Sequence, residues 1–263
     1  MDWKAKYGPW ALVTGASVGL GADFVRQLAA KGLNIVLVAR RQGRMETLAQ
    51  EVQNAHGIQT RIIAADLTSE GACQQVIDQT SDLEVGLLVN NAGFGMSGEY
   101  HTLDADHQVK MTVLNCVVPV LLTNHYLPPM LERGRGGMIF LASIAAYQPT
   151  PTFSTYGATK AFNLMLGESL WREYRKQGVD CLALSPGYTQ TEFADVAKMQ
   201  GAGGLRVAKS ENLVAWGLKK LGKKGSTIHG LLNFILAFSV RTGPRRLINA
   251  ISYVMLRRRS KTA

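Results

Sequence analysis

Cysteines and metal-binding patterns are scarce in this sequence of 263 residues. Its three cysteines, Cys73, Cys116 and Cys181, are odd in number and widely spaced, which argues against a disulfide framework and for a reducing compartment. The five histidines are scattered, and no group of cysteines and histidines has the spacing of metal ligands. We therefore expect neither a disulfide-stabilised secreted domain nor a metal site.

Long hydrophobic runs are also missing. The first residues lack the apolar segment of a secretory signal, and the most apolar run, residues 231–240, is too short to span a bilayer. Apolar residues make up 46% of the chain and charged residues 18%, which is a globular composition. We expect a cytoplasmic protein built on one large α/β domain, which its length suits.

Acidic residues are almost absent from the last quarter of the chain. Residues 1–200 hold 16 Lys and Arg against 18 Asp and Glu, whereas residues 201–263 hold 13 against the single Glu211. The net charge of +10 therefore belongs to the C-terminal part. A uniformly basic nucleic-acid-binding protein is the wrong description, and we expect no nucleic-acid partner.

Hydrophobic patterning predicts strands that alternate with helices. Short aliphatic runs, typical of strands buried on both faces, are separated by segments of helical periodicity. This alternation predicts one doubly wound parallel sheet of about seven strands with helices on both faces. The predicted strands are residues 9–14, 34–39, 59–65, 85–90, 137–142, 179–184 and 225–229, and the predicted helices are 22–30, 44–54, 71–80, 104–131 (kinked at Pro119), 155–177 and 210–221.

Tyr156 and Lys160 stand four residues apart in the predicted helix 155–177, so both side chains can point into one pocket. A phenol has an ordinary pKa of about 10 and exchanges protons poorly near neutral pH, but a neighbouring cation lowers that pKa. The pair is therefore a candidate general acid/base. Such pairs are common on helices, so this one gains weight only from the motifs around it.

The segment TGASVGLG, residues 14–21, joins the first predicted strand to the first predicted helix. Glycines in this position let the backbone turn tightly and approach a pyrophosphate, which the N–H groups of the helix N-terminus bind. The spacing is G-x-x-x-G-x-G rather than G-x-G-x-x-G. A tight strand-to-helix turn without a ligand is the alternative.

The end of the second predicted strand bears on the choice of dinucleotide. An acidic residue there binds the ribose 2′-hydroxyl of NAD, whereas an Arg accommodates the 2′-phosphate of NADP. Arg40 and Arg41 follow this strand, and no carboxylate does. The sequence therefore predicts NADP(H), with Arg40 as the main contact. Two solvated arginines at the start of a loop are the alternative.

Taken in order, these motifs resemble the short-chain dehydrogenase/reductase family. The resemblance implies a single Rossmann-like catalytic domain over residues 1–230. It also implies NADP(H)-dependent interconversion of a ketone or aldehyde and an alcohol, and a homo-oligomer. The matching residues cover about positions 8–195 and are Thr14 to Gly21, Asp66, Asn90 to Gly93, Asn115, Ser143, Tyr156, Lys160, Pro186 and Gly187.

The resemblance assigns catalytic roles to four residues. Tyr156 would be the general acid/base, and the hydroxyl of Ser143 would hold the substrate oxygen. Lys160 would lower the pKa of Tyr156 and bind the nicotinamide ribose, and Asn115 would hold a water that extends the proton relay. Ser143 could instead merely end a strand, and Asn115 could be an ordinary helix residue.

The resemblance also implies a cofactor site. Asp66 would contact the adenine, Pro186 and Gly187 would close over the nicotinamide, and Thr189 would lie near the carboxamide. Residues 90–93 could also be a simple turn. Residues 189–208 would form the substrate lid. The full implied set is Thr14, Gly15, Ser17, Gly19, Leu20, Gly21, Arg40, Arg41, Asp66, Leu67, Asn91, Ala92, Gly93, Tyr156, Lys160, Pro186, Gly187 and Thr189.

Residues 231–263 form a predicted basic, amphipathic C-terminal extension. Residues 231–238 are apolar nearly all round, and Leu247, Ile248, Ile251, Val254 and Met255 then make an apolar stripe at helical spacing. Such a segment suits peripheral contact with an anionic membrane. Packing on the body of the protein, or a homo-oligomer interface, is the alternative.

The apolar extension also predicts a lipophilic carbonyl substrate, together with aromatic residues and methionines near the expected site: Phe94, Met96, Phe153, Tyr188, Phe193 and Met199. A 3-oxoacyl-thioester reductase of the same family is a narrower alternative. A non-catalytic NADP(H)-binding sensor or scaffold at a membrane is a competing class. Ser143, Tyr156 and Lys160 argue against a sensor, which needs no proton relay.

Overall fold

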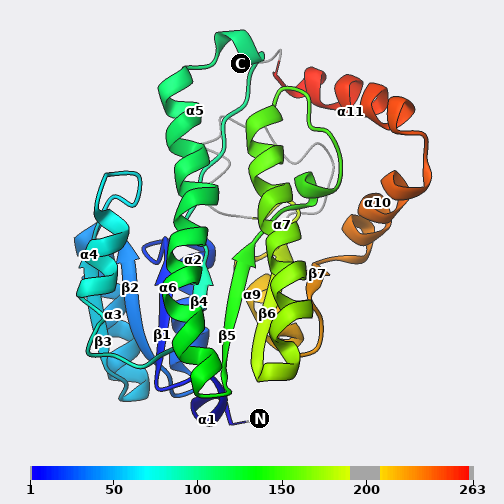
Figure 1. The fold of residues 1–263 in the computed structure, drawn as a ribbon. Coiled ribbons are helices and arrows are strands. Elements are labelled where there is room, and N and C mark those ends of the chain that lie inside the picture. The colour runs from blue at the N-terminus through cyan, green and yellow to red at the C-terminus, as the bar shows by residue number, and fades with distance from the viewer. Residues whose placement is uncertain (1, 190–207, 261–263) are drawn as a thin grey trace.

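The computed structural model describes residues 2–189 and 208–260. Within them, one seven-stranded parallel sheet has the order β3-β2-β1-β4-β5-β6-β7 (Figure 1). The predicted doubly wound parallel fold is confirmed. The strands are β1 (Trp10–Thr14), β2 (Asn34–Ala39), β3 (Thr60–Ala64), β4 (Val85–Asn90), β5 (Gly136–Leu141), β6 (Val179–Ser185) and β7 (Ser226–Ile228).

Helices cover both faces of the sheet. Apolar residues of α2, α3 and α9 pack on one face, and those of α4, α6 and α7 pack on the other. Every residue of β1, β4, β5 and β6 is buried, as their aliphatic sequences predict. The α-helices are α1 (Trp3–Tyr7), α2 (Gly19–Ala29), α3 (Gln42–His56), α4 (Ala72–Asp78), α5 (Ala105–Thr112), α6 (Val118–Glu132), α7 (Ser154–Tyr174), α9 (Ser210–Lys220), α10 (Leu231–Thr242) and α11 (Arg245–Ser260).

The predicted helix 104–131 is interrupted by a π-helical turn, η2 (Val113–Val117), which lies between α5 and α6. The cause is Pro119, which has no N–H to donate to the carbonyl of Asn115 four residues earlier. The N–H of Val118 donates instead to the carbonyl of Val113, five residues earlier. The discontinuity thus lies in the turn before the proline, and it contains Asn115.

The short helix α1 is absent from the sequence-based prediction, because five residues show no reliable period. Asp2 caps it by accepting a hydrogen bond from the N–H of Ala5 at 3.0 Å. The buried Tyr7 ends it and donates a hydrogen bond of 2.7 Å to Asp180 on β6. This hydrogen bond therefore attaches α1 to β6.

The chain builds the sheet in one direction from β1 through β2 to β3, and then in the opposite direction from β4 to β7, so the direction reverses between β1 and β4. The carboxyl ends of neighbouring parallel strands diverge at such a switch point and leave a crevice for ligands. α10 and α11 lie on the side of this crevice near α7 and β7 (Figure 1). Among the described residues, no helix combines the length and apolar character needed to cross a membrane. Apart from Thr189 and Ala208, the predicted substrate lid lies outside the described residues.

Candidate active site

A cavity of about 710 Å³ opens at the carboxyl ends of the strands and is bounded on one side by α10 and α11. The loops that follow β1 to β6 all contribute to its lining. Of the residues to which the resemblance assigns a catalytic or cofactor-binding role, all but Thr14 and Asn115 line this cavity. They are Gly15, Ser17, Gly19, Leu20, Gly21, Arg40, Arg41, Asp66, Leu67, Asn91, Ala92, Gly93, Ser143, Tyr156, Lys160, Pro186, Gly187 and Thr189.

Thr14 is buried behind the glycine turn rather than exposed to the cavity. Its hydroxyl accepts hydrogen bonds of 3.0 Å from the backbone N–H groups of both Asn91 and Ala92. The amide of Asn91 in turn donates to the carbonyl of Thr14 at 2.8 Å. Thr14 therefore ties the loops after β1 and β4 together, and its contact with a cofactor stays a prediction.

The glycine turn is shaped for a close approach of its backbone to a ligand. Gly15 has a φ of +67°, and a Cβ at Gly21 would lie 2.0 Å from the carbonyl oxygen of Gly15. No side chain caps the N-terminus of α2, because Val18 occupies the N-cap position. The first N–H groups of α2, at the edge of the cavity, therefore suit an anionic phosphate.

The end of the cavity beside β2 and β3 combines positive and negative groups. Arg40 and Arg41, which follow β2, line it together with Asp66, which follows β3. Burial raises the pKa of Asp66, but hydrogen bonds from the N–H and hydroxyl of Thr68 and the charge of Arg40 outweigh burial, so the pKa is lowered. Thr68 also lines the cavity and is missing from the sequence-based set. Its place two residues after an Asp is the turn signal that could have identified it.

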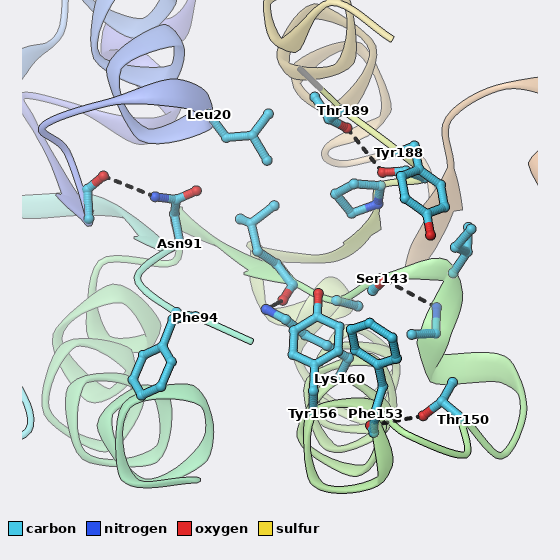
Figure 2. Close-up of a pocket in the computed structure, with 18 of the residues that line it drawn as sticks. Leu20, Asn91, Phe94, Ser143, Thr150, Phe153, Tyr156, Lys160, Tyr188 and Thr189 are labelled. Atoms are coloured by element: carbon cyan, nitrogen blue, oxygen red, sulfur yellow. Dashed lines mark hydrogen bonds between the residues drawn. The ribbon is translucent and has the colours of Figure 1, made fainter. Parts of the chain in front are cut away.

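The predicted catalytic side chains Ser143, Tyr156 and Lys160 converge on one part of the cavity (Figure 2). Tyr156 and Lys160 both come from α7, and the Lys160 ammonium lies 5.8 Å from the centre of the Tyr156 ring. The ammonium donates a hydrogen bond of 2.8 Å to the carbonyl of Leu141 at the end of β5. Ser143 follows β5 and hydrogen-bonds the Tyr156 phenol. Its hydroxyl oxygen also accepts from the N–H of Ala145 at 3.1 Å, which fixes its position.

Burial decides the protonation of this group. Burial raises the pKa of Tyr156 to about 12, although the hydrogen bond with Ser143 lowers it. Burial also lowers the pKa of Lys160 to about 8. The effect of burial on the pKa of Tyr156 therefore outweighs the lowering expected from Lys160. At neutral pH the phenol holds its proton. The arrangement suits a proton donor better than a ready phenolate base.

Asn115 is buried and lies behind the cavity, where its side chain joins two elements. Its amide oxygen accepts from the N–H of Phe94 at 3.2 Å, and its amide nitrogen donates to the carbonyl of Phe94 at 3.0 Å. The same nitrogen donates to the hydroxyl of Thr159 at 3.0 Å. The loop after β4 is thus fastened to α7 beside Lys160. A Cβ at Gly93 would lie 2.8 Å from the Asn115 amide oxygen, so this packing requires glycine there.

The other end of the cavity is apolar and is closed by the C-terminal extension. Phe94, Phe153 and Tyr188 line it from the body of the protein, as expected from the sequence, but Met96 does not. Phe193 and Met199 lie outside the described residues. α10, α11 and the turn between them contribute residues missing from the predicted site residues: Leu236, Ala237, Ser239, Val240, Gly243, Leu247, Ile248, Ile251, Ser252 and Leu256.

α10 is packed directly on the segment expected to close over a nicotinamide. A Cβ at Gly187 would lie 2.3 Å from the amide nitrogen of Asn233, so only glycine permits this contact. The same nitrogen donates to the carbonyl of His229 at 2.8 Å, which holds the side chain in place. The extension therefore packs against the body of the protein and lines the apolar end of the cavity, and packing on the body is one of the alternatives that the sequence left open. No cluster of three or more potential metal ligands occurs in residues 2–189 and 208–260.

Comparison with known proteins identifies similar folds and sequences. The very-long-chain 3-oxoacyl-CoA reductase of Macaca fascicularis is 30% identical over 240 residues, which are 88% of this chain and 75% of that protein. A solved 7β-hydroxysteroid dehydrogenase superposes with a TM-score of 0.89 at 28% identity and covers 96% of this chain and 99% of its own. A short-chain dehydrogenase of Sphingobium yanoikuyae in complex with NADPH gives a TM-score of 0.79 at 30% identity over 90% and 94%.

A family model described as short chain dehydrogenase matches residues 9–201, nearly the whole sheet and the cavity's polar lining. The match contains the glycine turn, the Ser143–Tyr156–Lys160 group and Pro186–Gly187, which the structure brings to one cavity. The chain belongs to the short-chain dehydrogenase family.

Proposed function

We propose that the protein is an NADP(H)-dependent oxidoreductase that reduces a bulky, lipophilic ketone or aldehyde to the alcohol. The observation that carries this proposal is the position of Tyr156. Its protonated phenol lines one cavity whose two parts are the end at the glycine turn and the apolar end lined by α10 and α11, which we call the apolar chamber. A dinucleotide fits the first part and a lipophilic carbonyl fits the second.

The glycine turn and the arginines after β2 support NADP(H) as the cofactor. Gly15 and Gly21 leave room for a pyrophosphate at the N-terminus of α2. Arg40 and Arg41 would pair with the 2′-phosphate, and no acidic residue follows β2 to bind a ribose hydroxyl. The related Sphingobium yanoikuyae enzyme, solved with NADPH, supports the same assignment.

The proton chemistry follows from the pKa values of Tyr156 and Lys160. When bound, NADPH supplies a hydride to the carbonyl carbon. The phenol of Tyr156 donates its proton to the carbonyl oxygen as that oxygen gains negative charge, and Ser143 donates a hydrogen bond to the same oxygen. Lys160, whose pKa is lowered to about 8, then returns a proton to the Tyr156 phenolate, whose pKa is about 12. This transfer is downhill, and Lys160 is recharged through the relay that includes Asn115.

The apolar chamber and the comparisons support a bulky substrate. The solved 7β-hydroxysteroid dehydrogenase leaves only about ten of the 263 residues of this chain unmatched, so the shared fold includes most of residues 231–263. A 3-oxoacyl thioester is the second candidate, supported by the related 3-oxoacyl-CoA reductase. We favour the rigid, bulky ketone because residues of α10 and α11 wall in the chamber.

A graded panel of carbonyl compounds tests the proposed activity. NADPH consumption is measured with ketones from small and polar to large and apolar, with a steroid ketone and a 3-oxoacyl-CoA at the upper end. We expect kcat/KM to rise roughly fourfold for each additional buried methylene until the chamber is full. Val240→Phe, inside the chamber, should impair only the largest substrates, whereas Val120→Phe on the exposed face of α6 should change nothing. A panel on which size has no effect would refute the lipophilic assignment.

Charge substitutions after β2 test the cofactor. In the variant Arg40→Asp/Arg41→Ile, loss of the charge-assisted hydrogen bonds to a 2′-phosphate should shift the NADPH:NADH ratio of kcat/KM toward NADH by roughly tenfold or more. Lys223→Asp/Lys224→Ile, at two adjacent exposed positions between α9 and β7 that do not line the cavity, makes the same charge change and should leave the ratio unaltered. An unchanged ratio in the arginine variant would contradict the assignment of NADP(H).

We also propose that the extension contacts an anionic membrane surface. α10 exposes apolar side chains away from the cavity, including Leu231 at 76% and Phe238 at 58% exposure, and Tyr253 and Val254 on α11 are also exposed. Uncovered apolar surface of this extent is unusual for a protein in water. A two-fold contact between two such faces would bring the basic sequences of both chains together, which favours an anionic lipid surface as the partner.

Sedimentation with lipid vesicles tests this contact. The protein should bind vesicles of phosphatidylcholine with phosphatidylserine, bind those of phosphatidylcholine alone more weakly, and dissociate as salt is added. Phe234→Gln/Phe238→Gln on α10 should abolish binding, whereas Val109→Gln/Met165→Gln, equally exposed on α5 and α7, should not. Light scattering of the same samples measures the homo-oligomer that we predict. Equal vesicle binding by both double variants would contradict the membrane proposal. So would an oligomer that dissociates in the α10 variant and stays intact in the control variant.

A further inference from the structure

Asn163 is a buried polar residue of α7 that the proposed chemistry does not use. Its exposure is 2%, and it follows Lys160 by three residues. It does not line the cavity. A buried amide is costly unless its donors and acceptors are paired, so its presence in the protein interior calls for a specific partner.

The partner is the main-chain carbonyl of Asn115. The side-chain nitrogen of Asn163 donates to this carbonyl at 2.7 Å and to the carbonyl of Thr159 at 2.9 Å. Thr159 directly precedes Lys160 and receives the hydrogen bond from the Asn115 side chain. Asn163 therefore closes a second link between η2 and α7, next to the link that the Asn115 side chain makes.

The sequence explains why the Asn115 carbonyl needs a side-chain donor. In an uninterrupted α-helix this carbonyl would accept from the N–H of residue 119, but residue 119 is proline. The N–H of Val118 is used by the carbonyl of Val113. Pro119 thus deprives the Asn115 carbonyl of its helical partner, and Asn163 supplies a replacement from the neighbouring helix.

This contact controls the direction of the carbonyl. A carbonyl oxygen has two acceptor positions, and the bond from Asn163 takes one, so the direction of the other is fixed. Meanwhile the side chain of Asn115 holds Phe94 and Thr159. Asn115 is therefore held both by its side chain and by its backbone, and α7 takes part in both contacts.

We propose that Asn163 is a positioning residue for the proton relay, and that it acts by fixing the Asn115 carbonyl in the π-helical turn. The inference rests on the proposed function, in which Lys160 gives a proton to Tyr156 and must regain one. The second acceptor position of the Asn115 carbonyl would then hold the water that hands a proton to Lys160. Asn163 touches neither substrate nor cofactor, and its effect passes through Asn115.

Isotope effects on the variant Asn163→Leu test this role, because leucine keeps the approximate shape and removes the donor. We expect kcat to fall roughly 10- to 100-fold, as for other residues that orient a reacting group, while the Kd for NADPH stays within about twofold. The solvent deuterium isotope effect on kcat should rise, and the primary effect of deuterated NADPH should fall, because proton supply becomes rate-limiting. Thr80→Val, which removes a buried hydroxyl bonded to Tyr126 at 2.6 Å, should lower stability without changing either isotope effect.

The double variant Pro119→Ala/Asn163→Leu separates positioning from stability. The N–H of residue 119 can now satisfy the Asn115 carbonyl within an ordinary helix, so the melting temperature should recover while kcat stays low. Recovery of both would show that Asn163 only satisfies a buried carbonyl, and would overturn the proposal. Wild-type kcat and isotope effects in Asn163→Leu would overturn it too.

Hydrogen exchange distinguishes failure of this inference from failure of the proposed function. Backbone amides of residues 114–118 should exchange faster in Asn163→Leu than in the wild type, whatever the substrate proves to be. If the wild type reduces no carbonyl, the proposed function fails, and faster exchange would support only the control of the turn by Asn163. If protection is unchanged in the variant, Asn163 does not hold the turn and the inference fails on its own.

Discussion

The active site depends on the contact between the loop after β4 and helix α7, which the buried amide of Asn115 makes. This amide pairs with both backbone groups of Phe94 and donates to Thr159, so it sets the distance between the loop expected to carry the cofactor and the helix that carries Tyr156 and Lys160. Pro119 creates the π-helical turn in which this residue lies. The irregular helical turn thus helps to fix the distance between the loop after β4 and α7.

Burial shifts the pKa values of Tyr156 and Lys160, the two groups that this spacing brings together. The same packing that brings Tyr156 and Lys160 together removes them from water, which raises the pKa of the phenol and lowers that of the ammonium. Together the two shifts favour proton transfer from Lys160 to the Tyr156 phenolate, and the raised pKa of the phenol keeps it protonated at neutral pH, as a proton donor must be. On the far side, α10 and α11 supply an apolar wall, and the contact of Asn233 with Gly187 joins that wall to the polar end of the cavity. The polar and apolar ends of the cavity therefore share one boundary.

Much of this could be predicted from the sequence, because it depends on local pattern. Aliphatic runs predict the seven strands, and the spacing of Tyr156 and Lys160 predicts that they share a pocket. What could not be predicted depends on distant contacts. The structural role of Thr14 requires Asn91, the raised pKa of Tyr156 requires complete packing, and the pairing of Asn163 with Asn115 requires the two helices to be side by side. In the extension, the apolar stripe predicted from the sequence contains Leu247, Ile248 and Ile251, which do line the cavity. The first helix gives no such sign, because its apolar residues lie nearly all round it over residues 231–238.

The most direct test of the account is the variant Tyr156→Phe, measured for NADPH binding by fluorescence titration and for carbonyl reduction under saturating cofactor. The account predicts a Kd for NADPH within about twofold of the wild type and a kcat lowered by roughly 100-fold or more, because one positioned proton donor is removed. Tyr147→Phe removes a nearby hydroxyl that is bonded to Ser185 and serves as the control. A Tyr156→Phe variant that reduces carbonyls at the wild-type rate would contradict the account. A wild type that binds NADPH and reduces nothing would favour the sensor instead.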